Sequence, residues 1–166
     1  MIVLIAMAAA AATPDLVGCR QGECVWARPV SNVPVRTTRA GTLRKLVTMR
    51  GVSLHPDMPP EHYRPGLRIA WDKQPETRYV LCSRTRPALA FRDGPRWIAH
   101  ALDLFSPAAY QYASVVTYLK ACHGLDHRRP GAERAMRRLG YRPGTRSDQV
   151  EIDRPEQLFA LPARRG

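Results

Sequence analysis

The sequence lacks long hydrophobic runs, and it also lacks the familiar signatures of catalytic sites. No stretch approaches the roughly 20 consecutive apolar residues of a membrane-spanning helix, which argues against a polytopic membrane protein. It contains no G-x-S-x-G, no H-E-x-x-H and no glycine-rich phosphate loop. Acidic residues are scattered singly, so no glycosidase-type carboxylate pair can be nominated. The sequence therefore predicts no cofactor and nominates no catalytic residue.

Lysine is scarce, although the chain is strongly basic. Three of the 26 basic residues are lysines (Lys45, Lys73 and Lys120), and with 14 acidic residues the net charge is +12. Arginine, alanine, proline and glycine are abundant together, a bias that a GC-rich coding sequence would produce without any binding surface. A protein of this charge is nevertheless attracted to polyanions by a long-range, salt-sensitive field.

Length and composition predict one modest domain. A chain of 166 residues with 45% hydrophobic residues can bury an ordinary core, which excludes general disorder. Aromatic side chains dominate most cores, so we expect at least two of the three tryptophans (Trp26, Trp71 and Trp97) to lie there.

The N-terminus predicts export. Residues 1–12, MIVLIAMAAAAA, form an apolar run that ends abruptly at Thr13 and Pro14. Ala10 and Ala12 supply the small side chains that signal peptidase accepts, so cleavage after Ala12 is expected to release a periplasmic or secreted protein. The alternative is a buried alanine-rich N-terminal helix.

A lipid anchor at Cys19 is a second possibility. Residues 16–19, Leu-Val-Gly-Cys, resemble the lipobox of bacterial lipoproteins. However, Pro14 and Asp15 interrupt the apolar run, and lipidation would leave an odd number of cysteines in an oxidising compartment. Export without lipidation is therefore favoured.

The four cysteines indicate two disulfides. Three pairings of the four cysteines are possible. The short turn-forming spacer between Cys19 and Cys24 favours their pairing, with Cys82 then joined to Cys122 across 40 residues. The competing hypothesis is zinc, with Cys122 followed by a nearby His127, but structural zinc sites usually contain a second closely spaced ligand pair. The sequence predicts no metal.

Local patterns indicate several strands and one principal helix. Ser106 and Pro107 resemble a helix start and Gly124 a helix end, while Tyr110, Ser114, Tyr118 and Cys122 recur every four residues on one face. We expect this helix to pack on a sheet and to be tethered to the strand that carries Cys82. The expected elements are strands at 42–49, 67–71, 79–82 and 88–91, a proline-rich loop at 55–66 and a helix at 107–123, whereas 97–105 fits a helix or a strand.

These elements predict an α+β fold: a small antiparallel sheet with one main packed helix, stabilised by disulfides. Residues 13–124 form the expected compact domain. Residues 125–166 form a basic C-terminal segment, partly helical at 132–139 or mobile, with an apolar patch at 158–161.

Function is predicted only at the level of class. Arg78, Arg84 and Arg86 lie close together along the chain and are candidates for anion binding, although a solvated strand face is the favoured interpretation. We expect a non-enzymatic exported protein whose arginine-rich surface meets an anionic envelope component or a partner protein. One alternative is an extracytoplasmic enzyme with a site near His100 and His123. Another, if export is wrong, is a cytoplasmic nucleic-acid-binding protein.

The export hypothesis predicts a defined mature form. The periplasmic species should start at Thr13 and take up four alkyl groups only after reduction, since all four cysteines would be oxidised. Intact-mass measurement of fractionated cells, with thiol alkylation before and after reduction, reads both features. A full-length cytoplasmic species with four free thiols would contradict the hypothesis.

Overall fold

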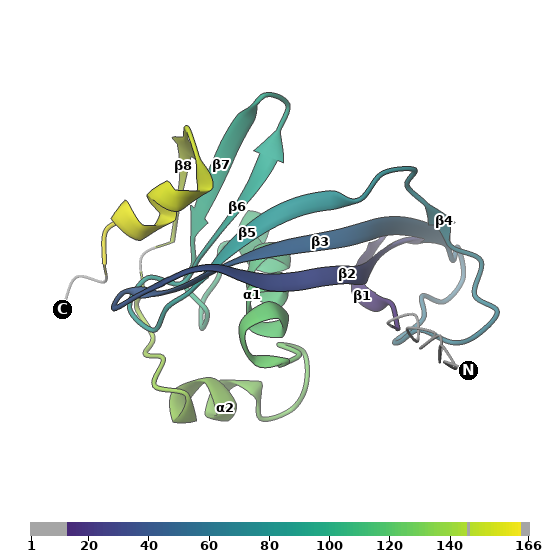
Figure 1. The fold of residues 1–166 in the computed structure, drawn as a ribbon. Coiled ribbons are helices and arrows are strands. Elements are labelled where there is room, and N and C mark those ends of the chain that lie inside the picture. The colour runs from purple at the N-terminus through teal and green to yellow at the C-terminus, as the bar shows by residue number, and fades with distance from the viewer. Residues whose placement is uncertain (1–12, 146, 164–166) are drawn as a thin grey trace, which may run out of the picture.

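The protein is built on one strongly curved antiparallel sheet (Figure 1). The computed structural model describes residues 13–145 and 147–163, and within them eight strands form this sheet in the order β1-β2-β3-β5-β6-β7-β8, with β4 paired to β3. The strands are β1 (Asp15–Arg20), β2 (Glu23–Thr38), β3 (Gly41–Leu54), β4 (Ala70–Trp71), β5 (Glu76–Cys82), β6 (Ala88–Asp93), β7 (Arg96–Ala101) and β8 (Asp148–Ile152). The expected antiparallel α+β fold is confirmed.

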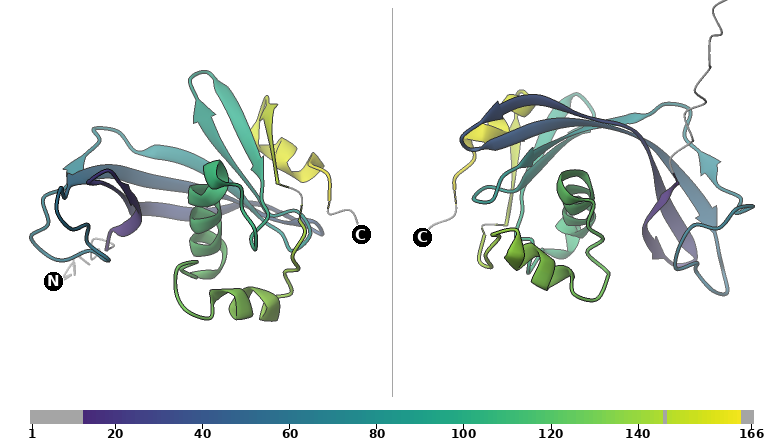
Figure 2. Two further views of the ribbon diagram at one scale, coloured as in Figure 1. Left: turned by 180° about the vertical axis from the view of Figure 1, so that it is seen from behind. Right: turned by 60° about the horizontal axis from the view of Figure 1, so that its bottom comes forward.

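Two α-helices and two short 3-10 helices complete the fold: η1 (Ala109–Gln111), α1 (Tyr112–His123), α2 (Ala132–Arg138) and η2 (Pro155–Ala160). The sheet arches over α1, and η2 lies on the other side of the sheet (Figure 2). No helix in the described part of the chain is long and apolar enough to cross a membrane. The predicted signal peptide, residues 1–12, lies outside the described residues.

The helix end was predicted correctly, but its start was not. Gly124 adopts φ 65° and its N–H donates to Lys120 O at 2.9 Å, so it terminates α1 as expected. In place of the expected start at Pro107, a turn forms in which the Asp103 carboxylate accepts N–H groups of Phe105 and Ser106. The α-helix begins only at Tyr112.

The long strand β2 was missed by sequence reasoning. Its prolines, Pro29 and Pro34, lie at register shifts, and β1 pairs with β2 only as far as Ala27. Beyond Ala27, in the described structure, β2 forms a sheet edge, where a missing N–H breaks no ladder hydrogen bond. The expected strand at 67–71 shrinks to β4, whereas those at 42–49, 79–82 and 88–91 lie within β3, β5 and β6. The expected loop at 55–66 is confirmed, and 97–105 begins as β7.

The sheet carries a core on each face. On β5, Val80 belongs to the cluster that includes α1, and Leu81 belongs to the cluster under η2. This alternation follows from the two-residue period of a strand. A third cluster lies at the β1–β4 end around Trp26. Trp26 and Trp97 are buried, which confirms the expectation that at least two tryptophans lie in the core.

The segment after residue 124 takes part in these cores. Met136 and Tyr141 join the α1 cluster, and Leu158 and Leu161 join the cluster under η2. Strand β8 pairs with β7, and α2 lies within the region where a helix was expected. Residues on both sides of position 124 therefore share the same packing.

Both expected disulfides are present, Cys19–Cys24 and Cys82–Cys122. The first closes the β1–β2 hairpin, and the second joins the end of β5 to the last turn of α1. A cross-link stabilises mainly by lowering the entropy of the unfolded chain, and the effect grows with loop length.

We therefore expect unequal effects of removing the two disulfides. Cys82→Ala/Cys122→Ala should lower the free energy of unfolding by about 4 kcal/mol and Cys19→Ala/Cys24→Ala by about 2 kcal/mol, given their loop lengths. Urea unfolding of both double variants measures the difference. An equal or larger loss in the Cys19/Cys24 variant would contradict this account.

Candidate functional site

Helix α1 lies toward one half of the sheet and leaves a groove over the other half. Val115 and Leu119 are buried with Val80 and Leu89 of β5 and β6. Tyr112, Ala113 and Val116, on another side of α1, line a groove of about 690 Å³. The side chains of one helix thus serve both a packed core and an open groove.

The sheet wall of the groove comes from β1, β2, β3 and β5. Much of the groove lining is apolar. Two of its charged residues, Glu76 and Arg78, form an ion pair in which a carboxylate oxygen lies 2.8 Å from a guanidinium nitrogen. The apolar lining is contributed by Leu16, Val17, Val25, Ala27, Pro29, Leu46, Ala109, Tyr112, Ala113, Val116, Ala121 and Leu125. A volume of this size lies within the range of roughly 300–1,000 Å³ typical of ligand pockets.

Polar contacts hold α1 at this distance from the sheet. At its C-terminal end, Asn32 of β2 donates to Ala121 O at 2.9 Å, close to the Cys82–Cys122 disulfide. Nearer its start, Ser114 Oγ lies 2.9 Å from Nδ1 of His100 on β7. Both ends of the helix are therefore fixed relative to the sheet, and these contacts set the width of the groove.

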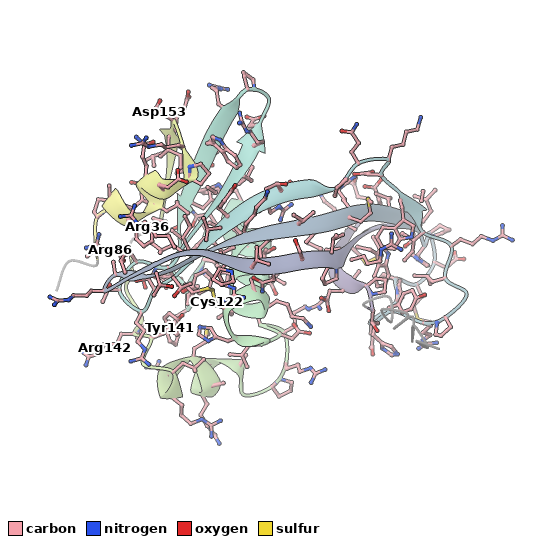
Figure 3. The ribbon with its side chains drawn as sticks, in the orientation of Figure 1. Arg36, Arg86, Cys122, Tyr141, Arg142 and Asp153 are labelled. Carbon is pink, nitrogen blue, oxygen red and sulfur yellow. A yellow bond between two sulfur atoms is a disulfide. The ribbon has the colours of Figure 1, made fainter. Side chains whose placement is uncertain are left out.

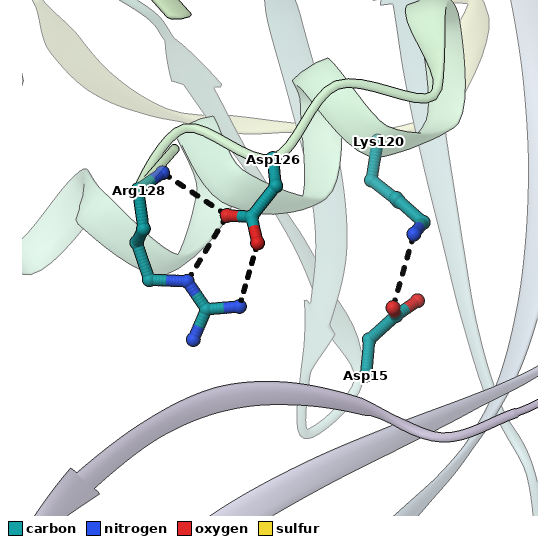
Figure 4. Close-up of polar contacts among 4 residues, drawn as sticks. All are labelled: Asp15, Lys120, Asp126 and Arg128. Atoms are coloured by element: carbon teal, nitrogen blue, oxygen red, sulfur yellow. Dashed lines mark hydrogen bonds and ion pairs between the residues drawn. The ribbon is translucent and has the colours of Figure 1, made fainter. Parts of the chain in front are cut away.

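A second hollow, of about 610 Å³, borders the groove at the C-terminal end of α1. Two ion pairs lie where the hollows meet: Lys120 Nζ is 3.0 Å from Asp15 Oδ1, and Arg128 Nε is 3.0 Å from Asp126 Oδ1 (Figure 4). All four residues line both hollows, and so does Leu125. The hydrogen bonds from Arg128 hold the pKa of the Asp126 carboxyl below its usual value.

The three arginines predicted to bind anions do not converge on one site. Arg78 lines the groove, and its guanidinium donates to Glu76 and to Thr117 of α1. Its buried Nε has no hydrogen-bond partner among the described residues. Arg86 extends toward η2 and donates to Phe159 O at 2.6 Å (Figure 3). Arg84 lies against Gly140. A shared anion site at these three positions thus stays a prediction that their contacts do not support.

His100 and His123 belong to separate networks. His100 lies between Ser114 and Gln149, and burial lowers the pKa of its imidazole, an effect that the Gln149 hydrogen bond partly offsets. His123 Nε2 lies 2.6 Å from Tyr141 OH. Burial, and then the charge of nearby Arg84, lowers the pKa of His123. Ser114 and His123 lie nine positions apart on α1, about 13 Å along its axis.

The tyrosine network joins α1 to the chain after α2. Tyr118 OH lies 2.8 Å from Tyr141 OH and contacts both backbone groups of Ser83, accepting from its N–H and lying 3.0 Å from its carbonyl oxygen. Burial raises the pKa of Tyr118 well above its usual value, so the phenol stays protonated at neutral pH. Figure 3 places Tyr141 near Cys122, beneath the sheet. These groups connect elements of the core to one another.

Ser114 and His100 do not form an accessible nucleophile–base pair. Ser114 and His100 have the spacing of a nucleophile and base, but Ser114 is 7% exposed and His100 4% exposed. In a catalytic triad a carboxylate contacts the histidine from the other side. Here the Gln149 amide takes that place, and a neutral amide cannot stabilise an imidazolium as a carboxylate does. Across residues 13–145 and 147–163, no cluster of three or more His, Cys, Asp or Glu side chains could hold a metal ion.

Comparison with known proteins gives no match to any family, curated protein or solved structure. The groove was not predicted from sequence. A usable signal was present, because Tyr112 and Val116 form an apolar i, i+4 pair outside the face formed by Ser114, Tyr118 and Cys122. A helix with apolar residues on two sides requires either two cores or one core and a groove.

The lowered histidine pKa values predict a pH dependence of stability. A histidine whose pKa is lowered in the folded state binds fewer protons when folded than when unfolded. The free energy of unfolding therefore keeps its full value above about pH 6.5 and falls as the pH drops from there through the folded-state pKa values of His100 and His123. Urea unfolding between pH 7.5 and 5 should show this loss. The slope should flatten in His100→Gln/His123→Gln and persist in the control His62→Gln, an exposed loop residue. An unchanged slope in the double variant would contradict the assignment.

Proposed function

We propose that this protein is a non-enzymatic, extracytoplasmic binding protein that holds an extended apolar molecule, such as an acyl chain, in the groove between α1 and the sheet. The observation that carries the proposal is the apolar side of α1 that borders the groove and does not pack against the sheet. There, Tyr112, Ala113 and Val116 face an apolar sheet wall across a groove of about 690 Å³.

The energetics favour a chain-like ligand. Each buried methylene contributes about 0.8 kcal/mol of transfer free energy, so a chain gains affinity along the length of the groove. The α-helix bordering the groove is about 18 Å long at 1.5 Å per residue. Because α1 is fixed to the sheet at both ends, binding requires little reorganisation of the protein.

The proposal also includes an extracytoplasmic location and a role in binding rather than in catalysis. Disulfides such as Cys19–Cys24 and Cys82–Cys122 persist in oxidising compartments, which is compatible with an extracytoplasmic protein. His100, which is buried, and His123, which is half-buried, already interact with protein groups, which supports binding rather than catalysis. An anionic envelope component remains the proposed source of the ligand, in keeping with the net charge of +12.

Blocking the groove tests the proposal. Ala113 is exposed on α1 and lines the groove, so Ala113→Trp should fill part of it and weaken binding of the neutral apolar dye N-phenyl-1-naphthylamine by roughly tenfold or more. Dye fluorescence, titrated against the purified protein with its own N-terminus, measures the dissociation constant.

The matched control is Ala160→Trp, at an exposed position of η2 that lines neither hollow. This variant adds the same indole elsewhere and should bind the dye as the unmodified protein does. Absence of dye binding by the unmodified protein would overturn the proposal, and so would equal binding by both variants.

A further inference from the structure

We infer that the groove's ligand is an amphiphile with an anionic head, and that the head is held by Arg134 and Arg138 in the second hollow. The inference rests on the proposed function, because it assigns the apolar tail to the groove. It adds the chemical class of the ligand and the direction in which it lies.

The charge in the second hollow is unevenly compensated. Two of its cations have carboxylate partners, Lys120 with Asp15 and Arg128 with Asp126. Arg129, Arg134 and Arg138 also line it, and among the described lining residues only Glu61 is a further acid. The hollow therefore carries an excess of positive charge beside an apolar groove.

Arg134 and Arg138 form the centre of this excess. They lie four residues apart on α2, so they are neighbours on one side of the helix, where like charges repel. No side-chain hydrogen bond or ion pair occupies either guanidinium within the described structure, whereas Arg137 is paired with Glu133 at 2.7 Å. A bound anion would relieve the repulsion, and an arginine fork matches the oxygens of a carboxylate or phosphate.

The shared border of the two hollows gives the ligand's direction. Leu125, Lys120 and Asp126 line both spaces at the C-terminal end of α1, so the head and the tail of one molecule can lie on the two sides of this border. The tail then runs along α1 toward Ala109, over the apolar part of the wall. Inside the groove, Arg78 is paired with Glu76 and Arg50 with Asp72. Arg20 also lines the groove, but Glu23, its register partner across β1 and β2, lines it too, so the groove carries no comparable excess of positive charge.

Three amphiphiles of equal chain length separate the head from the tail: laurate, dodecanol and dodecyltrimethylammonium. Each displaces N-phenyl-1-naphthylamine from the full chain below its micelle concentration. Laurate should do so at a concentration roughly tenfold or more lower than dodecanol, and dodecyltrimethylammonium should be the weakest. Added salt should reduce the laurate preference because the arginines are exposed.

Variants then locate the head. Arg134→Gln/Arg138→Gln should remove the difference between laurate and dodecanol while leaving dodecanol displacement unchanged. The matched control Arg39→Gln/Arg142→Gln removes the same charge at exposed positions outside both hollows, and Arg142 points away from the fold (Figure 3). It should keep the difference.

The outcomes distinguish the inference from the function beneath it. Equal displacement by all three amphiphiles, or a preference for the cation, overturns the anionic head and leaves the apolar groove standing. Loss of the laurate preference in the control overturns the placement at Arg134 and Arg138. Failure of the dye itself to bind overturns the proposed function, and the inference with it.

Discussion

The Cys82–Cys122 disulfide is the constraint on which the arrangement of α1 and the sheet depends. It joins the last turn of α1 to the end of β5, near the middle of the strand order. With this end fixed over β5, the buried side of α1 meets β5 and β6, and the β1–β2 half of the curved sheet extends beyond the helix. The groove is thus a consequence of where one covalent bond places a helix of limited width.

Polar contacts fix the orientation of α1 on the sheet, which the disulfide alone would leave free. A single cross-link would let α1 pivot, but Ser114 is held by His100 near the other end and Tyr118 contacts Ser83 between them. A buried polar group that loses its partner is costly, so these contacts favour one helix position over others. Under acid conditions these contacts reduce stability. The His100 imidazole takes up a proton in the unfolded chain at a pH where burial still keeps it neutral in the folded protein, because burial lowers its pKa.

Local patterns in the sequence predicted parts of the fold that local physics determines. Gly124 was identified as the helix end because glycine readily adopts the left-handed conformation that ends a helix. Strand β5 was found through its β-branched and aromatic residues, and β6 through Pro87 before it and the turn after it. Strand β2 was missed because Pro29 and Pro34 normally exclude strands, and only its position at the sheet edge makes them acceptable. The groove could not be predicted, since it depends on sheet curvature and on which side of α1 the sheet covers.

The distribution of charge separates affinity from selectivity. In the groove, Glu76 balances Arg78, so binding of a tail there depends on apolar area and responds little to salt. At the second hollow, the unpaired guanidinium groups of Arg134 and Arg138 act through water and are screened by salt. A ligand that spans both would therefore keep most of its affinity at high ionic strength while losing its preference for an acidic head. On the proposed function, the apolar groove would then supply the affinity for the chain, and the positive charge of the second hollow would supply the selectivity for the head.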